Sequence, residues 1–554
     1  MKKFLLPSLV LLAFIFGFGV AKYQGEITIE SIAEAEKILN LEFSDAKRNQ
    51  MLNSLKSNQR SLEALHGYEL DNNTPPAMVF NPLPIGFEVP SQQSVIDWNI
   101  PNNIDMPANK DELAFMGIAK LASLIQNRKI TSVELTQFFI SRLKTYGDTL
   151  ECVVTITEDR AMQMAQKADR EIAAGNYKGP LHGIPYGVKD LFAVEGYKTT
   201  WGAMPYKDQV REETATVVQK LDEAGAVLIA KLTLGALAMG DVWYGGVTKN
   251  PWNMEQGSSG SSAGSASAVA SGLVPFALGT ETLGSIVSPS TRCGVTGLRP
   301  TFGRVSRAGA MALSWSMDKV GPMTRSAEDL AIVFDAIQGV DGMDPSLIQS
   351  AFNYDSGKDL SQLKVGYIKS FFDGQYRGNE FDKQVLKDLE SLGVELREVQ
   401  WNFDLPITAL RIILNAEAGA AFDELTRSGM DSLLVAQGNN AWPNIFRSSR
   451  FISAADYINA NRVRTELIQQ VNALMQDYDV IVTPSYGGSQ LLVTNLTGQP
   501  CLVAPNGFFD NGSPSSISFI GNLFEEEKLI QLASAWQGIT EHNKLQPPLF
   551  ASSK

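Results

Sequence analysis

The stretch GSSGSSAGSASAVASG, residues 257–272, lies near the middle of a chain of 554 amino acids and contains no charged residue. It consists of serine, glycine and alanine with a single valine. A flexible linker of this composition would separate two domains and be flanked by polar segments. Here the chain continues as LVPFALGTETLGSIVSP, and no charged residue occurs between Glu255 and Glu281. The composition therefore predicts a buried turn followed by a small-residue helix, whose hydroxyls need hydrogen-bond partners.

Helical and strand-like patterns alternate along the chain from about Asp111 onward. SVELTQFFISRLKTYG has helical spacing, whereas AVLIAK, KVGYI, DVIVTP, CLVAP and SSISFIG are short apolar or β-branched runs. Such alternation is typical of proteins in which helices cover a sheet. We expect an α/β fold with a mixed, mostly parallel central sheet covered by helices on both faces.

The first residues, MKKFLLPSLVLLAFIFGFGVAKYQG, have the order of a signal peptide. Two lysines precede an apolar run, and Gly19 and Ala21 are small residues at the positions of a cleavage site. The unbroken run from Leu9 to Phe18 is short of the roughly 20 residues that span a bilayer. We expect a signal peptide over residues 1–21, export to the periplasm or outside the cell, and no stable membrane insertion after cleavage. An uncleaved N-terminal anchor stays as the alternative.

Two further segments follow the expected signal. Apolar residues between Ile27 and Leu65 recur at helical spacing and predict two amphipathic helices, and DNNTPPAMVFNPLPIGFEVPSQQ then reads as an extended connection. We expect a small N-terminal helical element with a proline-rich connection over residues 22–105. The main domain is expected to cover residues 106–554.

The overall composition excludes several function classes. The formal net charge is −13, which disfavours binding to the phosphates of a nucleic acid. Cys152, Cys293 and Cys501 are too few and too scattered for a disulfide framework or a zinc site, so we expect buried thiols. No metal site and no cofactor are expected, and no phosphate-binding loop motif occurs.

A serine in the quoted stretch needs a base before it can act as a nucleophile. Gly260 to Gly264 formally match the G-x-S-x-G nucleophile elbow around Ser262, with His542 as a base, although the residues before it form a polar loop instead of a strand. The other candidate base is Lys189, which ends the apolar run GIPYGV. Burial disfavours the ammonium form of such a lysine. Both alternatives stay open on these residues alone.

GIPYGVKD, GSSGSSAGSASAVASGLVPFALGTETLGSIVSPSTRCGVTGLRPTFGRVS and DKVGPMTRSAEDLAIVFDAI occur in this order and together resemble the amidase signature family. The resemblance extends from about residue 115 to 545. It implies a Ser-cisSer-Lys triad of Lys189, Ser261 and the nucleophile Ser285, with a cis peptide bond before Ser261. It further implies that Gly260 and Ser262 support the triad and that backbone N–H groups of an oxyanion hole come from Thr282, Leu283, Gly284 and Ser285.

The same resemblance implies an enzyme that hydrolyses a carboxylic amide to an acid and ammonia or an amine. A small-molecule or peptide amide is the expected substrate. Leu283 stands where the family commonly has glycine, and Val287 where it commonly has arginine, so the floor of the acyl site is expected to differ. Two further functions remain as alternatives: an esterase-like mechanism through Ser262 and His542, and the A-type subunit of an amidotransferase. A homodimer is left open.

Overall fold

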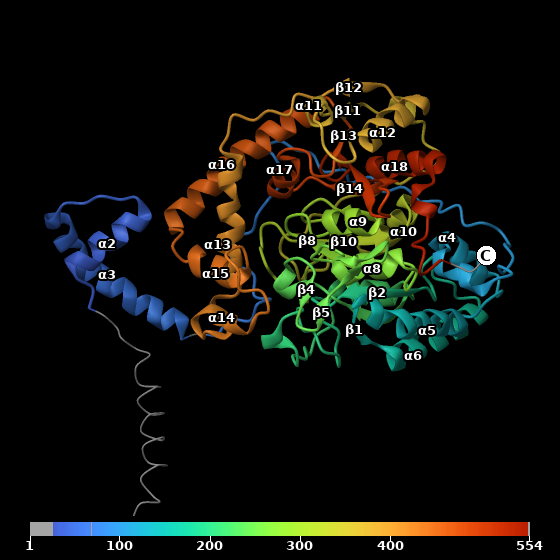
Figure 1. Cartoon of the computed structure of the whole chain (residues 1–554), viewed down its shortest axis with the longest axis horizontal. Coiled ribbons are helices and arrows are strands. Elements are labelled where there is room, and N and C mark those ends of the chain that lie inside the picture. Colours follow the sequence, from blue (N-terminus) through green and yellow to red (C-terminus); the bar gives the residue numbers. More distant parts are fainter. Residues whose placement is uncertain (1–25, 68, 552–554) are drawn as a thin grey trace, which may run out of the picture. The chain divides into compact units, whose positions relative to one another are not determined.

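The computed structural model describes residues 26–67 and 69–551. These residues form two compact units, one made of residues 26–67, 69–71 and 451–453 and the other of residues 72–450 and 454–551 (Figure 1). The expected signal peptide, residues 1–21, lies outside the described residues. Within the described ranges, no helix combines the length and the apolar character needed to cross a membrane.

The first unit contains the two helices predicted between Ile27 and Leu65. Helix α2 spans Ile29–Leu39 and helix α3 spans Asp45–His66. Thr28 caps α2, because its hydroxyl accepts the backbone N–H of Ser31 while the Ser31 hydroxyl accepts the N–H of Thr28. Arg48 of α3 donates to the carboxylate of Glu36 of α2, which ties the pair together.

The second unit is built on an eleven-stranded sheet among the described residues, in the order β1-β3-β2-β8-β10-β9-β14-β15-β13-β11-β12. The strands are β1 (Val153–Ile156), β2 (Pro185–Lys189), β3 (Val227–Leu232), β8 (Ala277–Glu281), β9 (Thr296–Arg299), β10 (Lys319–Thr324), β11 (Val365–Tyr367), β12 (Leu396–Glu398), β13 (Val480–Pro484), β14 (Cys501–Phe508) and β15 (Pro514–Gly521). Two small hairpins pair β4 (Val242–Trp243) with β5 (Gly246–Val247) and β6 (Lys249–Asn250) with β7 (Asn253–Gly257).

The α/β class and the mixed sheet are confirmed, and the five apolar runs quoted above lie on β3, β11, β13, β14 and β15. Parallel pairing occurs in two blocks, β3-β2-β8 and β13-β11-β12. The remaining six neighbouring pairs are antiparallel, so parallel pairs are fewer than expected. The reason is local: strands such as β14 and β15 are joined by a short loop, which can connect only antiparallel neighbours.

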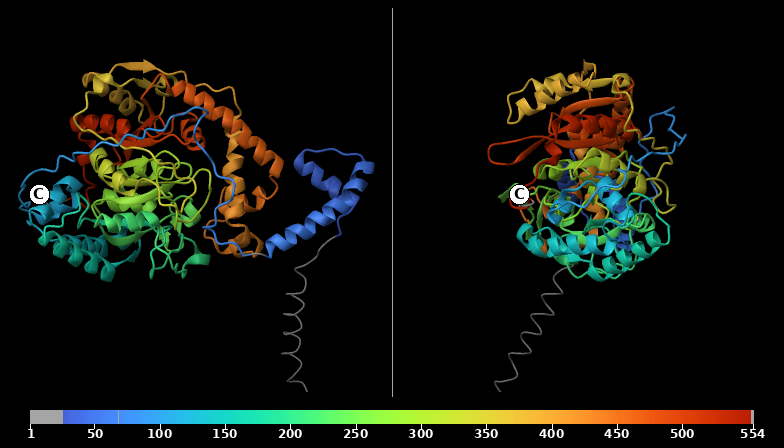
Figure 2. Two further views of the ribbon diagram at one scale, coloured as in Figure 1. Left: turned by 180° about the vertical axis from the view of Figure 1, so that it is seen from behind. Right: turned by 90° about the vertical axis from the view of Figure 1, so that its right-hand side faces the viewer.

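Helices flank the sheet on both faces (Figures 1 and 2). Helix α10 packs on β9 and β10, and α18 packs on β14 and β15, whereas α8 packs on β8. The α-helices of the second unit are α4 (Ile118–Gln126), α5 (Ser132–Leu150), α6 (Glu158–Ala173), α7 (Thr216–Glu223), α8 (Ala263–Ala270), α9 (Val287–Cys293), α10 (Ala327–Ile337), α11 (Lys369–Phe372), α12 (Asn379–Ser391), α13 (Arg411–Ala421), α14 (Asp423–Arg427), α15 (Trp442–Ser449), α16 (Ala454–Met475), α17 (Gln490–Thr497) and α18 (Glu526–Thr540).

The second unit also contains short 3₁₀ helices. They are η1 (Lys110–Phe115), η2 (Met204–Tyr206), η3 (Ala236–Ala238), η4 (Leu360–Gln362), η5 (Ile407–Leu410), η6 (Met430–Leu433) and η7 (His542–Lys544). Residues 72–105 contain no helix or strand and belong to the second unit, along which they run as an extended blue thread (Figure 2). Cys152, Cys293 and Cys501 are buried and free, as expected.

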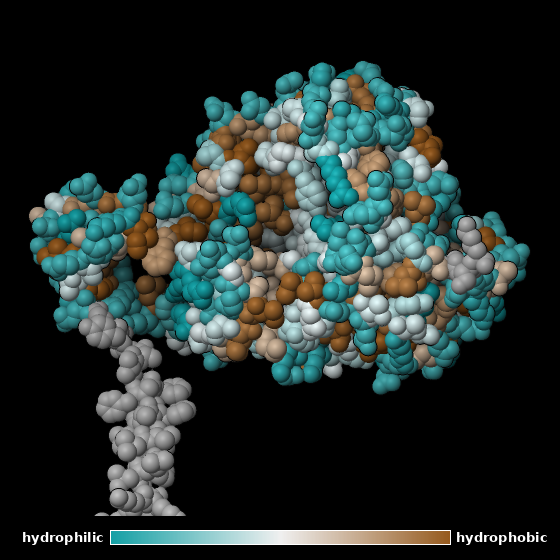
Figure 3. Space-filling view, in the orientation of Figure 1, coloured by the Kyte–Doolittle hydropathy of each residue, from teal (hydrophilic) through white to brown (hydrophobic). Residues whose placement is uncertain are grey.

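The surface of the second unit is mostly hydrophilic in the view of Figure 3. Apolar side chains gather there in a recess that lies, by comparison with Figure 1, between helices α13 and α16 and strands β8 and β10. Since loops and helix ends near the carboxyl ends of strands commonly form such recesses, this face is where a ligand site is expected.

Candidate active site

Lys189 is the last residue of β2 and is completely buried. Strand β2 runs parallel to β8, so the carboxyl ends of the two strands meet at the same edge of the sheet. This register brings the Lys189 Nζ within 2.8 Å of Ser261 Oγ and within 2.9 Å of Thr280 Oγ1 near the end of β8. A third hydroxyl, Ser262 Oγ, lies 3.2 Å from Nζ.

Burial lowers the pKa of Lys189 to about 7, from an ordinary value of 10.5. Its amine is therefore about half neutral at that pH and largely neutral above it. A neutral amine has two N–H donors and one lone pair. With the two donors directed to Thr280 and Ser262, the lone pair faces the hydroxyl of Ser261. When the amine is neutral, this arrangement allows Lys189 to accept a proton from Ser261.

The quoted serine-rich stretch is a buried turn followed by helix α8, as predicted. The peptide bond between Gly260 and Ser261 is cis, which agrees with the expectation from the resemblance. Gly260 lies so close to Gly240 that a Cβ atom would overlap the Gly240 carbonyl. Ser262 Oγ accepts the backbone N–H of Thr280 and donates to the Thr280 carbonyl, each at 3.1 Å, so it anchors the turn to β8.

Ser285 lies in the turn between β8 and helix α9 and is 8% exposed. Its carbonyl accepts the backbone N–H of Ser262 at 3.1 Å, which fixes this turn to the serine-rich one. Gly284 adopts a φ of +88°, a conformation that only glycine takes without strain. No acceptor among the described residues takes the backbone N–H groups of Leu283, Gly284 or Ser285. Three successive free donors at a buried turn can bind an oxyanion.

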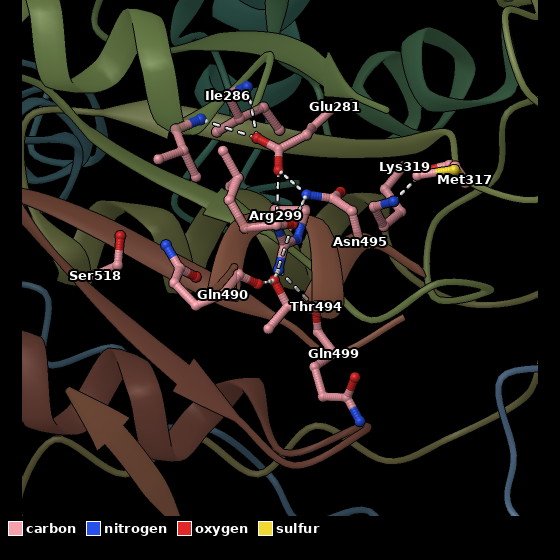
Figure 4. Close-up of polar contacts among 12 residues, drawn as sticks. Glu281, Ile286, Arg299, Met317, Lys319, Gln490, Thr494, Asn495, Gln499 and Ser518 are labelled. Atoms are coloured by element: carbon pink, nitrogen blue, oxygen red, sulfur yellow. Dashed lines mark hydrogen bonds and ion pairs between the residues drawn. The ribbon is translucent and has the colours of Figure 1, made fainter. Parts of the chain in front are cut away.

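Glu281 holds the turn that contains Ser285, here called the Ser285 turn or nucleophile turn after its proposed role, from inside the protein (Figure 4). Its carboxylate accepts the backbone N–H groups of Ile286 and Val287 at 2.9 and 3.0 Å, which are the first residues after Ser285. The other carboxylate oxygen accepts from Arg299 at 2.7 Å and from Asn495 at 2.9 Å. Burial alone raises the pKa of Glu281, but Arg299 and these N–H donors together lower it to about 2.

Glu281, Arg299 and Asn495 were not predicted from the sequence. One signal was present: Glu281 is the only charged residue between Glu255 and Arg292. A lone charge in an apolar run is either paired or functional. The partners of Glu281 could not be inferred from the sequence, because Arg299 and Asn495 follow it by 18 and 214 residues.

A second carboxylate, Asp318, supports the other end of the turn. It accepts the hydroxyl of Thr282 at 2.6 Å and the backbone N–H groups of Leu313 and Ser314 at 2.8 and 2.9 Å. Thr282 is thus held through its side chain. The turn is fixed at one end by the buried carboxylate of Glu281 and at the other by the half-buried carboxylate of Asp318, with Ser285 between them.

Two residues that depart from the common family pattern occupy different surroundings. Val287 packs with Cys501, Val503 and Leu491 in a small apolar cluster. Leu283 is partly buried against the main core. Leu491 of α17 lies close to Gly284 as well. Val287 therefore packs in an apolar cluster at a position where an arginine would have introduced a charge.

His542 is not brought to the serines. It lies on η7, where its ring packs against Trp536 with centroids 6.4 Å apart. No hydrogen bond joins it to Ser262 within the described ranges, and the Ser262 hydroxyl is engaged by Lys189 and Thr280 instead. His182 is buried, and its Nε2 lies 3.1 Å from the carboxylate of Glu171.

An α/β fold with a buried lysine beside paired serines and a turn of free N–H donors defines a hydrolase that acts on carbonyl compounds. The model of the amidase family matches residues 134–491, more than half of the chain. The chain belongs to this family, the amidase signature enzymes, and is an enzyme that hydrolyses amide C–N bonds.

Individual relatives are similar over most of the chain. The A-type subunit of the glutamyl-tRNA(Gln) amidotransferase of Coxiella burnetii is 34% identical over 480 residues, which cover 78% of this chain and 99% of the relative. The native peptide amidase of Stenotrophomonas maltophilia is 28% identical with a TM-score of 0.69, covering 78% of this chain and 98% of that one. A vestigial complex described as revealing the origins of an s-triazine catabolic enzyme is 26% identical with a TM-score of 0.70, covering 76% and 98%.

Proposed function

We propose that this protein is a serine amidase in which Ser285 is the nucleophile and Lys189 and Ser261 form its proton relay. The observation that carries this proposal is the 2.8 Å approach of Lys189 Nζ to Ser261 Oγ at a buried site, where the pKa of the lysine falls to about 7. A lysine that is neutral near pH 7 is a competent general base.

In the first half of the reaction, Ser285 Oγ forms a bond to the amide carbonyl carbon. Its proton passes to Ser261, whose own proton passes to Lys189. The negative charge on the carbonyl oxygen is received by the N–H groups of Leu283, Gly284 and Ser285, with Thr282 as a further candidate donor. Each well-aimed donor contributes roughly 10² to 10³ in rate.

In the second half, the C–N bond breaks and the relay returns its proton to the leaving nitrogen, which departs as ammonia or an amine. Water then attacks the acyl-Ser285 ester and loses a proton to the same relay. The C–O bond to Ser285 breaks, the relay returns the proton to Ser285 Oγ, and the acid is released. The bridging hydroxyl of Ser261 lets one lysine serve both proton transfers without approaching the substrate itself.

The test uses the protein with a panel of short aliphatic, aryl and peptide C-terminal amides. We expect turnover by the wild type, and loss of it in Ser285→Ala. Lys189→Ala should lower kcat/KM by about 10² to 10⁴, the usual contribution of a general base. His542→Ala is the matched control and should retain activity. Turnover that survives Ser285→Ala, or that depends on His542 and not on Lys189, would show the mechanism to be wrong.

Export is part of the proposal and rests on the first 21 residues alone. The basic start, apolar run and small residues at Gly19 and Ala21 support it. Cell fractionation followed by N-terminal sequencing tests it: the exported protein should begin at Lys22. A protein that stays in the cytoplasm with Met1 at its terminus contradicts export.

A second candidate function is favoured by one observation, the 34% identity to the A-type subunit of an amidotransferase over nearly the whole of that relative. Under this alternative the chain would work as one subunit of a larger enzyme that acts on charged tRNA. The net charge of −13 disfavours direct contact with a polyanion. Amide hydrolysis by the isolated chain favours the first candidate, whereas activity that requires further subunits and tRNA favours the second.

A further inference from the structure

A small cavity opens beside the proposed relay. It has a volume of about 70 Å³ and is lined by Thr280, which contacts Lys189, and by Thr282 of the nucleophile turn. This is about half of the roughly 150 Å³ of an engineered apolar cavity that binds benzene. Alanines and larger apolar residues line much of the remainder, among them Ala310, Ala312 and Val320. The cavity has room for a group of only a few carbon atoms.

The charged side chains that line this cavity are engaged with the protein. Arg307 pairs with Asp344 at 2.8 Å. Asp318 accepts from Thr282 and from two backbone N–H groups. Lys319 donates to the carbonyl of Met317, and burial holds its pKa well below the ordinary value. A charged substrate group would find no free partner here and would lose its hydration, so the cavity favours an uncharged group.

One wall of the cavity comes from the N-terminal connection, through Asn73 and Pro75. This segment lies well before residue 134, where the match to the family begins. Neighbouring Asn72 holds it to Ala312, another residue that lines the cavity: the Asn72 side chain accepts the N–H of Ala312 at 2.7 Å and donates to the Ala312 carbonyl at 3.0 Å. Asn73 Nδ2 donates to Glu213 at 2.9 Å.

Contacts further along the connection keep this wall in position. Phe80 meets Phe302 edge to face at a centroid distance of 5.0 Å, and the guanidinium of Arg464 lies 3.5 Å from the centre of the Phe80 ring. Beyond it, the amide of Gln93 exchanges two hydrogen bonds with the backbone of Phe352. The connection is therefore a fixed part of the second unit at the cavity.

We propose that residues 72–75 are a specificity-determining wall of the substrate pocket, which restricts one substituent of the amide to a small, uncharged, mainly aliphatic group. This inference rests on the proposed function of Ser285. The wall is a feature of this chain's own connection, so it sets a preference that the family resemblance does not predict.

The test compares two double variants. Asn73→Ala with Pro75→Ala shortens both wall side chains, and Asn81→Ala with Pro76→Ala makes the same two kinds of change at exposed positions of the same connection outside the cavity. Each protein reacts with phosphonofluoridates whose alkyl or alkoxy group grows from one to eight carbons. Ser285 Oγ forms the bond to phosphorus, the P–F bond breaks, fluoride leaves, and the serine proton passes through Ser261 to Lys189. Intact mass gives the labelling rate constants.

We expect the wild type to react faster with short groups than with long ones in either the alkyl or the alkoxy series of phosphonofluoridates. In the wall variant the ratio of long-group to short-group rate constants should rise by roughly tenfold or more, the discrimination that one methylene gives in an apolar pocket. Because both rate constants are measured on the same protein sample, their ratio does not depend on the fraction of protein that is folded. If the wall variant leaves this ratio unchanged in both the alkyl and the alkoxy series, or if the control variant raises it equally, the proposal that residues 72–75 determine specificity is wrong. Absence of labelling at Ser285 in the wild type overturns the proposed function, and this inference with it.

Discussion

The carboxylate of Glu281 lies 2.7 Å from the guanidinium of Arg299, and both side chains are completely buried next to the turn that carries Ser285. The pair connects the end of β8 to the end of β9. Because Glu281 also accepts the N–H groups of Ile286 and Val287, the ion pair sets the position of the residues that follow the proposed nucleophile.

Removing one partner of this pair should cost stability and activity together. Arg299→Met leaves the buried carboxylate of Glu281 without its counter-charge, and Glu281→Gln leaves the buried guanidinium of Arg299 without its own. Each change should lower the free energy of unfolding by about 3–5 kcal/mol. The double variant removes both charges and should lose less than the sum of the two single losses. Urea denaturation gives the free energies of unfolding. Strictly additive losses would contradict the coupling.

Amidase activity should depend on pH through Lys189. The lysine must be neutral to accept a proton, and its pKa is about 7. We therefore expect kcat/KM to rise as the pH increases through about 7 and then to level off. Lys189→Arg should abolish this rise along with activity, since arginine stays protonated at these pH values. A flat profile between pH 5.5 and 8.5, measured with a neutral amide substrate, would contradict this role.

The same burial should make Lys189 a destabilising residue at neutral pH. Between its folded pKa of about 7 and its ordinary value of 10.5, the lysine binds a proton in the unfolded chain but not in the folded one. The free energy of unfolding contributed by this group therefore rises with pH across that window. Lys189→Met should be more stable than the wild type at pH 7, with a smaller advantage at pH 9.5. An exposed change, Lys358→Met, should show no such difference in urea titrations at the two pH values.

Gly260 should not tolerate a side chain. A Cβ atom at this position would overlap the carbonyl oxygen of Gly240, which is backbone and cannot rotate away. We expect Gly260→Ala to shift the serine-rich turn and lower kcat/KM by about tenfold or more, the scale of a small misplacement at a reacting centre. Gly438→Ala is the control, since nothing lies within 4 Å of its Cβ position. Equal kinetics of the two variants would show that the turn accommodates the methyl group.

Much of the fold was predictable because its signals are local. The apolar runs on β3, β11, β13, β14 and β15 and the amphipathic helices near the N-terminus show their periodicity within a few residues. Whether neighbouring strands pair in parallel or antiparallel was harder to predict from the sequence. It depends on which strands become neighbours, and β9 pairs with β14 although some two hundred residues of chain separate them.

The candidate site likewise has some features that the sequence predicts and others that only the tertiary structure reveals. Lys189, Ser261 and Ser285 stand in short motifs whose order carries the family resemblance, so the sequence by itself determined the class of enzyme and the residues to test. Tertiary structure decided what surrounds them: the burial that lowers the pKa of Lys189, the clamp of Glu281 by Arg299 and Asn495, and the wall that Asn73 and Pro75 contribute to the cavity. These properties arise from contacts between distant segments, and burial and charge pairing exist only once the chain has brought those segments together.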